Sequence, residues 1–353
     1  MDSLRIAQIA PLWTSVPPAE YGGAEQVIHW LTEGLVQRGC EVTLFASGDS
    51  RTTAALRATC GRNLLATMGD NEAYTYEPYA NASLVEAVRM ADAFDVIHCH
   101  LGAAFIPFAA LCPTPVLHTV HAALDAVDEL WVLEHYPDAP IAALSNSHVA
   151  AVSASRRQNI RVIYHGCDFE RYQGSTVPGE YLLFLSRMNS NKNPAGAIRV
   201  ARAVGMPIVL AGKAMTSAEE AYFDEQVRPF IDGRDVRYVG PVSFAEKVEL
   251  LRGAAALVFP IQWDEHFGLV MIEAMACGCP VVACGRGSVS EVVDSGMTGF
   301  YAGSEDELAA LVPRALSLDR RDVREHARRR FSVDRMVTDH LDLYKQLAAR
   351  RQG

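Results

Sequence analysis

The sequence lacks several patterns that identify common classes of protein. Its 353 residues contain no Asp-x-Asp, a pair of carboxylates that can hold a divalent metal against a nucleotide diphosphate. They also contain no G-x-G-x-x-G, so a nicotinamide-dependent dehydrogenase receives little support. No apolar stretch is long enough to cross a bilayer. The start, MDSLRIAQIAPLW, has no basic region followed by a long apolar core, so a secretory signal is not expected.

An excess of positive charge is also missing. The chain has 32 Lys and Arg against 42 Asp and Glu, a net charge of -10, which argues against a general nucleic-acid binder. Half of the residues are hydrophobic (50%) and about a fifth are charged (21%), as in an ordinary globular protein. The length favours two domains over one.

The eight cysteines do not form the framework of a disulfide-rich protein. They are scattered through apolar segments such as VIHCHL and MACGCPVVAC, which is typical of buried thiols in a reducing compartment. Cys277 and Cys279 form a C-x-C, but no second pair of ligands stands at the spacing of a metal site. We therefore expect no metal and a cytoplasmic location.

The first half of the chain alternates apolar runs with amphipathic segments. Residues 24–38 predict a helix because apolar side chains recur at helical spacing, and Gly39 marks its end. The expected strands of this half are 4–13, 41–48, 94–100, 115–121, 142–148 and 161–166. The order strand, helix, strand predicts a parallel, doubly wound sheet.

The same pattern restarts after a polar segment, CDFERYQGSTVPGE, that follows residue 166. The expected strands of the second half are 181–187, 207–212, 236–240, 256–261 and 280–284, and charged helices are expected at 305–318 and 321–350. We place the domain boundary in the polar segment, with one domain over 1–170 and another over 171–330. The predicted fold class is α/β, with two doubly wound domains and a site in the cleft between them, outside the carboxyl ends of the strands.

A first candidate site motif is EYGGAE, residues 20–25, between the first strand and the first helix. Gly22 and Gly23 would let the backbone approach a ligand closely, and the helix N-terminus behind them favours anions. A Gly-Gly pair that only forms a turn is the alternative.

A second motif is SRMNSNK, residues 186–192, after the first strand of the second domain. Arg187 and Lys192 stand at the carboxyl end of that strand, where two cations suit a diphosphate. An exposed polar loop is the alternative. The nearby AGKA, residues 211–214, lacks the other residues of a phosphate loop and is rejected as one.

Histidines end two strands of the first domain. His98 and His100 follow one strand, and His118 and His121 follow the next. A lone histidine is usually structural, but pairs at the ends of neighbouring strands favour contact between one of them and a substrate.

Two glutamates stand eight positions apart in WDEHFGLVMIEAMACGCPVVA. Glu265 lies among turn-like residues, whereas Glu273 lies in an apolar run that predicts a helix. The backbone N–H groups of Phe267, Gly268 and Leu269, at the helix start, form a predicted anion site. An anion flanked by two carboxylates that can accept hydroxyl groups describes a sugar, a diphosphate and a ribose.

This stretch, EHFGLVMIEAMACGCPVVA, resembles the E-x7-E signature of the GT4 glycosyltransferases, which have the GT-B fold of two Rossmann-like domains. The resemblance extends in order through nearly the whole chain. Its further motifs are YGGAE, VIYHGCDFERY, FLSRMNSNKN, VRYVGPVS and GSVSEVVDSGMTGF. It implies a retaining, metal-independent enzyme that uses a nucleotide sugar and no cofactor. It also implies that the C-terminal helix, 331–353, returns toward the N-terminal domain.

The resemblance also implies roles for individual residues. The implied roles are donor phosphate contact for Gly22 and Gly23, diphosphate binding for Arg187 and Lys192, contact with the transferred sugar for Glu265 and His121, ribose binding for Glu273, and contact with the base for Val242. Two departures from the family pattern are His266 and Ser290, which stand where proline is usual. Because His266 lies near the expected sugar pocket, a relative's sugar preference does not transfer directly.

The expected reaction moves a hexose from a UDP-sugar, first of all UDP-glucose, or from a GDP-sugar to a small-molecule, glycan or lipid-linked acceptor. Arg187, Lys192 and the helix N-terminus would stabilise the charge on the leaving diphosphate. We do not assign Glu265 as a nucleophile, although a double displacement would need one. The alternatives are a sugar-nucleotide epimerase of the GT-B fold, a non-catalytic nucleotide-sugar binding protein, and a phosphorylase that carries pyridoxal phosphate.

Overall fold

The structure is a computed structural model that describes residues 3–19, 22–70 and 75–351. The chain divides into two compact units, which are treated separately below. Unit 1 comprises Met1–Gly166 and Val333–Gly353, and unit 2 comprises Cys167–Ser332. The boundary predicted at residue 170 lies slightly later, and packing explains the difference. The Cys167 amide donates to the Phe331 carbonyl (2.8 Å), so the chain contacts unit 2 from Cys167 onward.

Unit 1 is built on a seven-stranded sheet in the order β3-β2-β1-β4-β5-β6-β7, in which every pair of neighbours is parallel. Its strands are β1 Arg5–Ile9, β2 Glu41–Ala46, β3 Ala55–Ala58, β4 Val96–Cys99, β5 Val116–His118, β6 Ile141–Ala143 and β7 Ile160–Val162. Its α-helices are α1 Gly23–Gln37, α2 Leu64–Gly69, α3 Glu77–Arg89, α4 Ile106–Ala109, α5 Val127–His135 and α13 Val333–Arg351. Its 3₁₀ helices are η1 Ala91–Ala93, η2 Ala103–Phe105, η3 Ser147–Val149 and η4 Arg156–Asn159.

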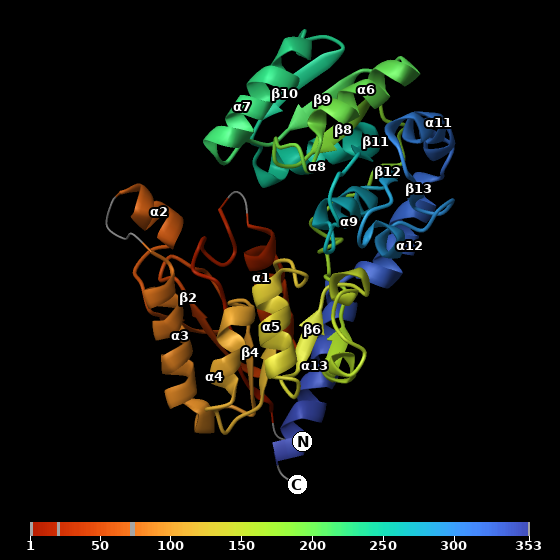
Figure 1. The fold of residues 1–353 in the computed structure, drawn as a ribbon. Helices are drawn as coiled ribbons and strands as arrows, with labels where there is room; N and C mark the ends of the chain where they lie inside the picture. The colour runs from red at the N-terminus through yellow and green to blue at the C-terminus, as the bar shows by residue number, and fades with distance from the viewer. Residues whose placement is uncertain (1–2, 20–21, 71–74, 352–353) are drawn as a thin grey trace. The chain divides into compact units, whose positions relative to one another are not determined.

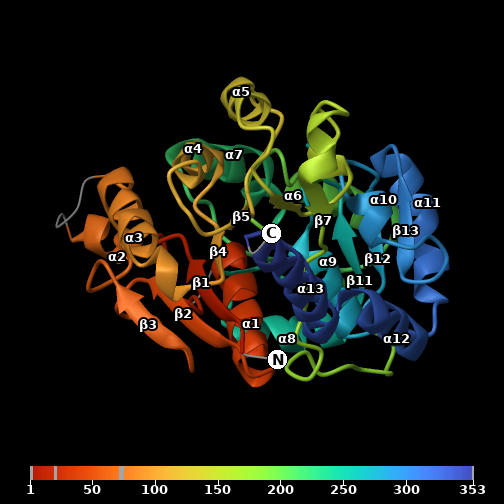
Figure 2. The same cartoon turned by 90° about the horizontal axis from the view of Figure 1, so that it is seen from below.

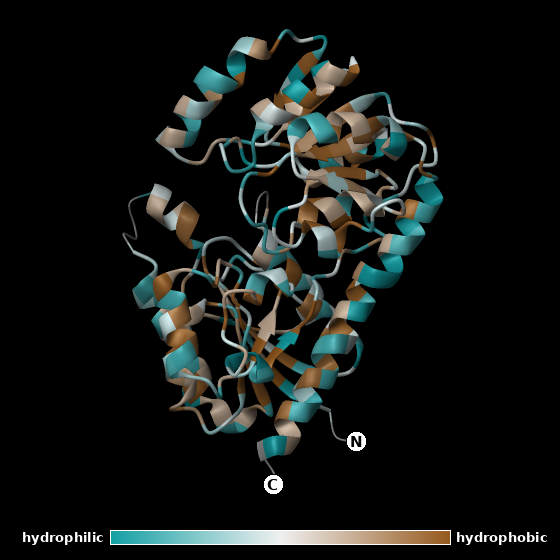
Figure 3. Cartoon of the chain, turned by 45° about the vertical axis from the view of Figure 1, so that its right-hand side comes forward, coloured by the Kyte–Doolittle hydropathy of each residue, from teal (hydrophilic) through white to brown (hydrophobic). Residues whose placement is uncertain are grey.

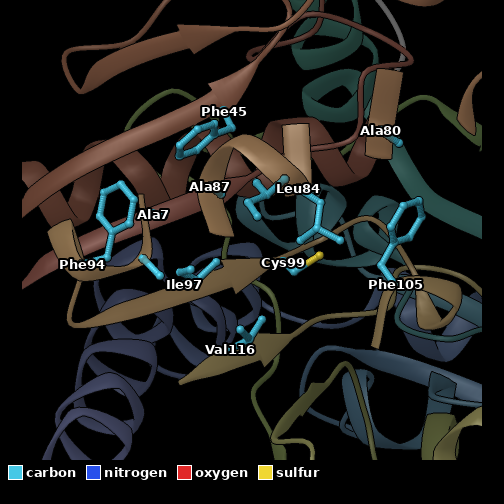
Figure 4. Close-up of a cluster of buried hydrophobic side chains, with 12 residues drawn as sticks. Ala7, Phe45, Ala80, Leu84, Ala87, Phe94, Ile97, Cys99, Phe105 and Val116 are labelled. Atoms are coloured by element: carbon cyan, nitrogen blue, oxygen red, sulfur yellow. The ribbon is translucent and has the colours of Figure 1, made fainter. Parts of the chain in front are cut away.

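Helices cover both faces of this sheet. On one face α3 packs over β1 and β2, and a buried apolar cluster fills the contact (Figure 4). Its members include Ala7, Phe45, Leu84, Phe94, Ile97 and Cys99. On the other face α13, drawn in blue in Figure 1, packs against α1 and β4, and the view in Figure 2 shows α1 and α13 side by side. The C-terminal helix therefore belongs to the same unit as the N-terminal strands.

Unit 2 is built on a six-stranded parallel sheet in the order β10-β9-β8-β11-β12-β13. Its strands are β8 Tyr181–Leu185, β9 Ile208–Ala211, β10 Val236–Gly240, β11 Ala254–Phe259, β12 Val281–Cys284 and β13 Gly299–Ala302. Its α-helices are α6 Pro194–Val204, α7 Ser217–Gln226, α8 Phe244–Gly253, α9 Leu269–Ala276, α10 Val289–Val292, α11 Glu305–Leu316 and α12 Arg320–Phe331, and a 3₁₀ helix, η5, covers Arg228–Phe230.

The central strands of unit 2 carry apolar residues without interruption. All six residues of β11 and all four of β12 are buried, as expected for parallel strands that helices cover on both faces. The hydropathy colours of Figure 3 agree, because brown residues concentrate on the strands and teal residues on the outer sides of the helices. The predicted α/β fold of two doubly wound domains is confirmed.

Some elements differ from the expectation. The strands β3 and β13 were not predicted, because each has only four residues and neither is a continuous apolar run. The predicted helix over 321–350 is two helices, α12 and α13, interrupted at Ser332. Among the helices of the described residues, none is both long enough and apolar enough to cross a membrane.

Buried histidines set unit 1 apart from an ordinary α/β core. Burial lowers the pKa of His118 to about 3 and that of His340 to about 4. Burial also lowers the pKa of His98, His100 and His165 well below the ordinary value. These imidazoles are therefore neutral in the folded protein, whereas the unfolded chain takes up protons as the pH falls below about 6.5. The free energy of unfolding should consequently fall from that pH downward, toward the lowered pKa values.

His118 allows this linkage to be tested at one residue. Both of its ring nitrogens are buried and have no hydrogen-bond partner within the described part of the chain. Replacement of His118 by leucine should keep or raise the stability at pH 7, because the substitution removes two unsatisfied polar atoms. It should also reduce the slope of the free energy of unfolding against pH, between about pH 6 and pH 4, by up to about 1.4 kcal/mol per pH unit.

Urea unfolding followed by tryptophan fluorescence at several pH values measures this slope. The matched control is Val127→Ala, because Val127 is exposed on α5 and its substitution removes no titratable group. An unchanged slope in His118→Leu would show that His118 does not contribute to the acid sensitivity.

Candidate functional site

The carboxyl ends of the strands of unit 2 gather most of the predicted donor-site residues at one edge of the sheet. Arg187 and Lys192 follow β8, Val242 follows β10, and Glu265 follows β11. Because all neighbouring strands of this sheet are parallel, the loops after them emerge at the same edge. Pairing brings the loops after β8 and β11 into contact, since Lys192 donates to Glu265.

Two asparagines fix the loop that presents the cations. Asn189 Oδ1 accepts from the Lys192 amide (2.9 Å), which closes a turn within the loop. Asn193 has a left-handed backbone (φ 58°), and it is buried. Its Nδ2 donates to the Pro260 carbonyl (3.0 Å), and its Oδ1 accepts from the Gly196 amide (2.9 Å) at the start of α6. The loop is therefore tied to the end of β11 and to a helix, which limits the movement of Lys192.

Arg187 is paired with a carboxylate that the sequence did not predict. Its Nη2 donates to Glu219 Oε1, on the first turn of α7. Glu219 also accepts from Asn189 Nδ2 (2.9 Å) and from the Met215 amide (2.6 Å). Burial raises the pKa of Glu219, but the hydrogen bonds from Asn189 and Met215 and the charge of Arg187 outweigh burial, so its pKa lies below the ordinary value. Glu219 is thus an ionised group that holds the guanidinium in place.

Lys192 and Glu265 form the second pair. The side chains retain only 16% and 10% exposure, so each charge would be costly to leave alone. The ammonium also lies over two rings, 5.3 Å from the centre of Phe259 and 5.1 Å from that of Trp263, which favours a cation there. A cation and a carboxylate are therefore kept together, largely out of water, at the edge of the sheet.

The backbone around Glu265 is held by a close approach of another loop. The Ser288 amide donates to the Glu265 carbonyl (2.8 Å). Gly287 has φ +59°, and a Cβ there would lie 2.3 Å from the same carbonyl oxygen, so only glycine fits. Helix α9 begins directly after Gly268, which is its N-cap and, within the described residues, has no side-chain cap. Leu269 is thus the first helical residue, as the anion-site prediction requires.

Phe267 lies in the core rather than in an open loop. Its side chain is buried, and its ring makes an edge contact with the ring of Phe331 (6.0 Å between centres). Any contact of Phe267 with a ligand would therefore come from its backbone. Val242, in contrast, is partly buried and stands directly before Ser243, the N-cap of α8.

Glu273 lies just over one turn into α9 and is buried, with two partners on the same oxygen. Tyr172 Oη donates to Glu273 Oε1 (2.6 Å), and Lys247 Nζ donates to it as well (2.7 Å). Burial and the charge of Glu273 raise the pKa of Tyr172, which therefore remains a neutral donor. Glu273 is thus paired through Oε1, and a ligand would contact its second oxygen, Oε2.

Gly22, Gly23 and His121 belong to unit 1. Gly22 is the N-cap of α1 and Gly23 is its first residue, while Glu20 and Tyr21 of the same motif lie outside the described residues. A Cβ at Gly22 would lie 2.7 Å from Pro18 Cβ, so the loop itself requires glycine there. Glu25 is buried in the first turn of α1, where burial raises its pKa. This helix start therefore already carries one acidic group of its own.

His121 lies beyond the end of β5 and is half-buried. Its Nε2 is 3.1 Å from His100 Nδ1, and its ring stacks on that of His165 (5.4 Å between centres). Burial and the neighbouring His148 and His340 lower the pKa of His121 to about 3, so the ring is neutral. Of the four histidines singled out from the sequence, His98, His100 and His121 belong to one hydrogen-bonded group, and His118 does not.

The sequence alone did not predict three residues that contact the candidate site residues. Glu219 stands three residues after Thr216, the N-cap of α7, so its spacing indicates only an ordinary helix start. Lys247 lies in a charged stretch of α8, and its neighbours in the sequence do not indicate that it pairs with Glu273. Gln8, whose Oε1 lies 2.9 Å from His100 Nε2, was detectable in principle, because a glutamine in the apolar strand RIAQI needs a buried hydrogen-bond partner.

No group of three or more His, Cys, Asp or Glu side chains suited to a metal ion occurs among the described residues. Cys277, Cys279 and Cys284 are buried and take part in no disulfide. Burial raises the pKa of Cys277 and of Cys279 to about 12, which keeps both as inert thiols.

Two family models cover most of the chain. The model for glycosyl transferases group 1 matches residues 170–330, and the model for Glycosyltransferase Family 4 matches residues 21–171. Among curated proteins, the chain is 26% identical over 395 residues to a glycogen synthase of Mycobacterium tuberculosis, covering 95% of this chain and 93% of that protein. It is 24% identical over 328 residues to a D-inositol 3-phosphate glycosyltransferase of Pseudarthrobacter chlorophenolicus, covering 79% and 78%.

Solved structures give the same result. The fold is similar to that of AviGT4, a glycosyltransferase involved in avilamycin A biosynthesis, with a TM-score of 0.72 and 26% identity over 98% of both chains. It is also similar to Anabaena Alr3699/HepE in complex with UDP and glucose, with a TM-score of 0.72 and 18% identity, covering 97% of this chain and 99% of that chain. With two parallel-sheet domains and these matches, the chain belongs to the GT4-type glycosyltransferases of the GT-B fold.

Proposed function

We propose that the protein transfers a hexose from a nucleoside diphosphate sugar to an acceptor hydroxyl, with retention of the anomeric configuration and without a metal. UDP-glucose is the first donor to test and a GDP-sugar the second. The acceptor is a small molecule, a glycan or a lipid-linked sugar. In this proposal, Arg187 and Lys192 bind the diphosphate, Glu265 and His121 contact the sugar, and Glu273 binds the ribose.

One observation carries the proposal: two cations are each held by a carboxylate at the carboxyl edge of the sheet of unit 2. Arg187 pairs with Glu219, and Lys192 pairs with Glu265. Both cations are therefore held in place by pairs within the protein itself. A diphosphate at this edge would find its counter-charges in place, which lowers the cost of ordering them on binding.

Binding would exchange partners within the second pair. Lys192 is a compact point charge with three donors, so it can turn from Glu265 toward a phosphate oxygen. Glu265 would then lose its partner and could accept hydrogen bonds from hydroxyl groups of the sugar. Arg187 has a planar fork of donors, so it can keep Glu219 on one nitrogen and offer another to the phosphate. The ligand thus turns an internal ion pair into two ligand contacts.

The chemistry follows from this arrangement. The bond between the anomeric carbon and the diphosphate breaks, and negative charge develops on the leaving oxygens beside Arg187 and Lys192. A bond forms between the anomeric carbon and the acceptor oxygen on the same face of the sugar. The acceptor's proton passes to the leaving diphosphate, so the products are the glycoside and the nucleoside diphosphate. Glu265 stabilises the sugar as it gains positive charge and is not a nucleophile.

The ligands and activities of similar proteins guide the choice of donors and acceptors. Structures of Alr3699/HepE contain UDP and glucose or UDP-glucose, which supports UDP-glucose as the first donor. The curated relatives include a glycogen synthase and D-inositol 3-phosphate glycosyltransferases, which supports an α-glucan and an inositol phosphate as members of the acceptor panel. His266 differs from the usual proline of the family, so UDP-galactose and GDP-mannose belong in the donor panel as well.

The test is a transfer assay on the full chain. Each donor is incubated with each acceptor, release of the nucleoside diphosphate is measured with and without EDTA, and the anomeric configuration of the product is determined by NMR. We expect one donor and acceptor pair to give a product of retained configuration at an unchanged rate in EDTA. Inversion, or activity lost in EDTA and restored by Mn²⁺, would contradict the proposed mechanism. An epimer formed from the donor alone would identify an epimerase instead.

The two glutamates of the E-x7-E motif should respond differently to substitution. Glu265→Gln should mainly lower kcat, because contacts to the sugar strengthen as the transition state forms. Glu273→Gln should mainly weaken binding of the nucleoside diphosphate, because ribose contacts are the same in the ground state and the transition state. Steady-state kinetics and calorimetry with the nucleoside diphosphate separate the two effects.

Lys247→Met is the matched control for Glu273. It removes the ammonium partner but leaves the carboxylate and its bond from Tyr172. If Glu273 only serves the packing around Lys247, both substitutions should weaken nucleotide binding alike, and the ribose assignment would be wrong. A loss of affinity in Glu273→Gln that clearly exceeds the loss in Lys247→Met supports the assignment, provided that thermal unfolding shows both variants folded.

A further inference from the structure

A continuous chain of hydrogen bonds crosses unit 1 between its sheet and helix α13. It is centred on Gln8, which is fully buried in the inner strand β1. Gln8 Oε1 is 2.9 Å from His100 Nε2, and His100 Nδ1 is 3.1 Å from His121 Nε2. On the other side, Gln8 Nε2 donates to Tyr344 Oη on α13 (2.9 Å).

The side chains of this chain share one face of the sheet. Ala7 and Ile9 point to the apolar cluster under α3, so Gln8, between them, points to the opposite face. Gln8 is the register partner of His98 on β4, which places the polar side chains of the two strands next to each other. The rings of His98 and His100 lie 3.9 Å apart. The face that α13 covers is thus polar at its centre.

The first arm of the network runs from Gln8 through His100 to His121. The Gln8 amide determines which ring nitrogens of this arm carry a hydrogen. A carbonyl oxygen only accepts, so His100 Nε2 must carry the hydrogen. His100 is neutral, because burial and the neighbouring His121, His340, His165 and His118 lower its pKa. Its Nδ1 is therefore bare and accepts from His121 Nε2. His121 is neutral as well, so its own Nδ1 is the remaining acceptor of the ring.

The second arm runs from Gln8 through Tyr344 and His98 to Thr119. Tyr344 Oη accepts from the Gln8 amide, so its single proton is directed to His98 Nδ1 (2.6 Å). Burial raises the pKa of Tyr344, which keeps that proton on the phenol. His98 Nδ1 then accepts, and its Nε2 donates to Thr119 Oγ1 (2.8 Å). Each hydrogen bond of the two arms therefore pairs one donor with one acceptor.

We propose that Gln8 is a positioning residue that fixes the tautomer of His121 through His100. In this tautomer Nε2 carries the hydrogen and Nδ1 is bare, so His121 accepts a hydrogen bond from a sugar hydroxyl. The proposal rests on the contact between His121 and the sugar that is proposed above. The opposite orientation of the Gln8 amide would reverse every proton of the network and give His121 an Nδ1 hydrogen. A phenol can donate as well as accept, so Tyr344 could partner either orientation, and the direction follows from the observed orientation, in which Gln8 Nε2 donates to Tyr344 Oη.

The direct test reads the tautomers in the full-length protein without a ligand. Heteronuclear NMR on protein with ¹⁵N-labelled histidine distinguishes a protonated from a bare ring nitrogen, and single His→Gln variants assign the signals. We expect the hydrogen on Nε2 in His98, His100 and His121. A hydrogen on Nδ1 of His100 and His121 would overturn the proposal, whatever the activity of the protein.

Gln8→Met tests the role of Gln8 as the element that selects the direction. Without the amide, His100 Nε2 loses the acceptor that fixes its hydrogen, so the His121 signals should show both tautomers. We expect kcat to fall by about threefold to tenfold while the affinity for the nucleoside diphosphate is unchanged. Tyr79→Phe on α3 is the control, and it should change neither the tautomers nor kcat.

The outcomes separate the two proposals. If Gln8→Met leaves the His121 tautomer as in the wild type, Gln8 does not fix that tautomer and the positioning proposal fails. If the tautomers become mixed but kcat is unchanged, the control of the tautomer by Gln8 stands and the contact of His121 with the sugar is wrong.

Discussion

The pairing of Lys192 with Glu265 is the interaction on which the account of the site depends. Both side chains are largely withdrawn from water, and such a pair persists only where each charge compensates the other. The surrounding residues hold both members of this pair in position. Asn189 and Asn193 fix the loop of the lysine, and Gly287 lets the backbone of another loop lie against the carbonyl of Glu265. The backbones of both loops are therefore held by internal contacts, while the Lys192 ammonium can still turn from Glu265 toward a phosphate oxygen, and such preorganisation favours electrostatic catalysis.

Unit 1 buries polar side chains as neutral groups instead of as ion pairs. Its sheet buries several histidines whose charged forms would be costly, and their pKa values are lowered by burial and by one another. Hydrogen bonds to Gln8, Tyr344 and Thr119 satisfy most of the network. A proton added to any of these rings would place two donors face to face. The C-terminal helix α13 contributes Tyr344, so the end of the chain completes the polar interior of the unit that contains its beginning.

The sequence predicted the fold well because its strands are apolar runs of ordinary length and its motifs occur in the order of a known family. It missed β3 and β13, whose pairing depends on the neighbouring strand rather than on a pattern of their own. For the site, periodicity placed Arg187, Lys192 and Glu265 at one edge of a sheet. The partners Glu219 and Lys247 come from helices, and spacing along the chain does not reveal which cation meets which carboxylate. Gln8 and Tyr344 are separated by almost the whole chain, so only the packing of α13 on the sheet brings them together.

The central claim is that Arg187 and Lys192 leave or share their carboxylates to bind a diphosphate. Calorimetric titration with a nucleoside diphosphate and with its nucleoside, on the wild type and on Arg187→Ala, Lys192→Ala and the double variant, tests it most directly. Each hydrogen bond to a charged group contributes about 1.5–3 kcal/mol, so each single variant should bind the diphosphate about tenfold to a hundredfold more weakly. The affinity for the nucleoside should not change. Diphosphate binding at wild-type affinity in all three folded variants would contradict the account, because both residues would then be no more than internally paired cations of the loop.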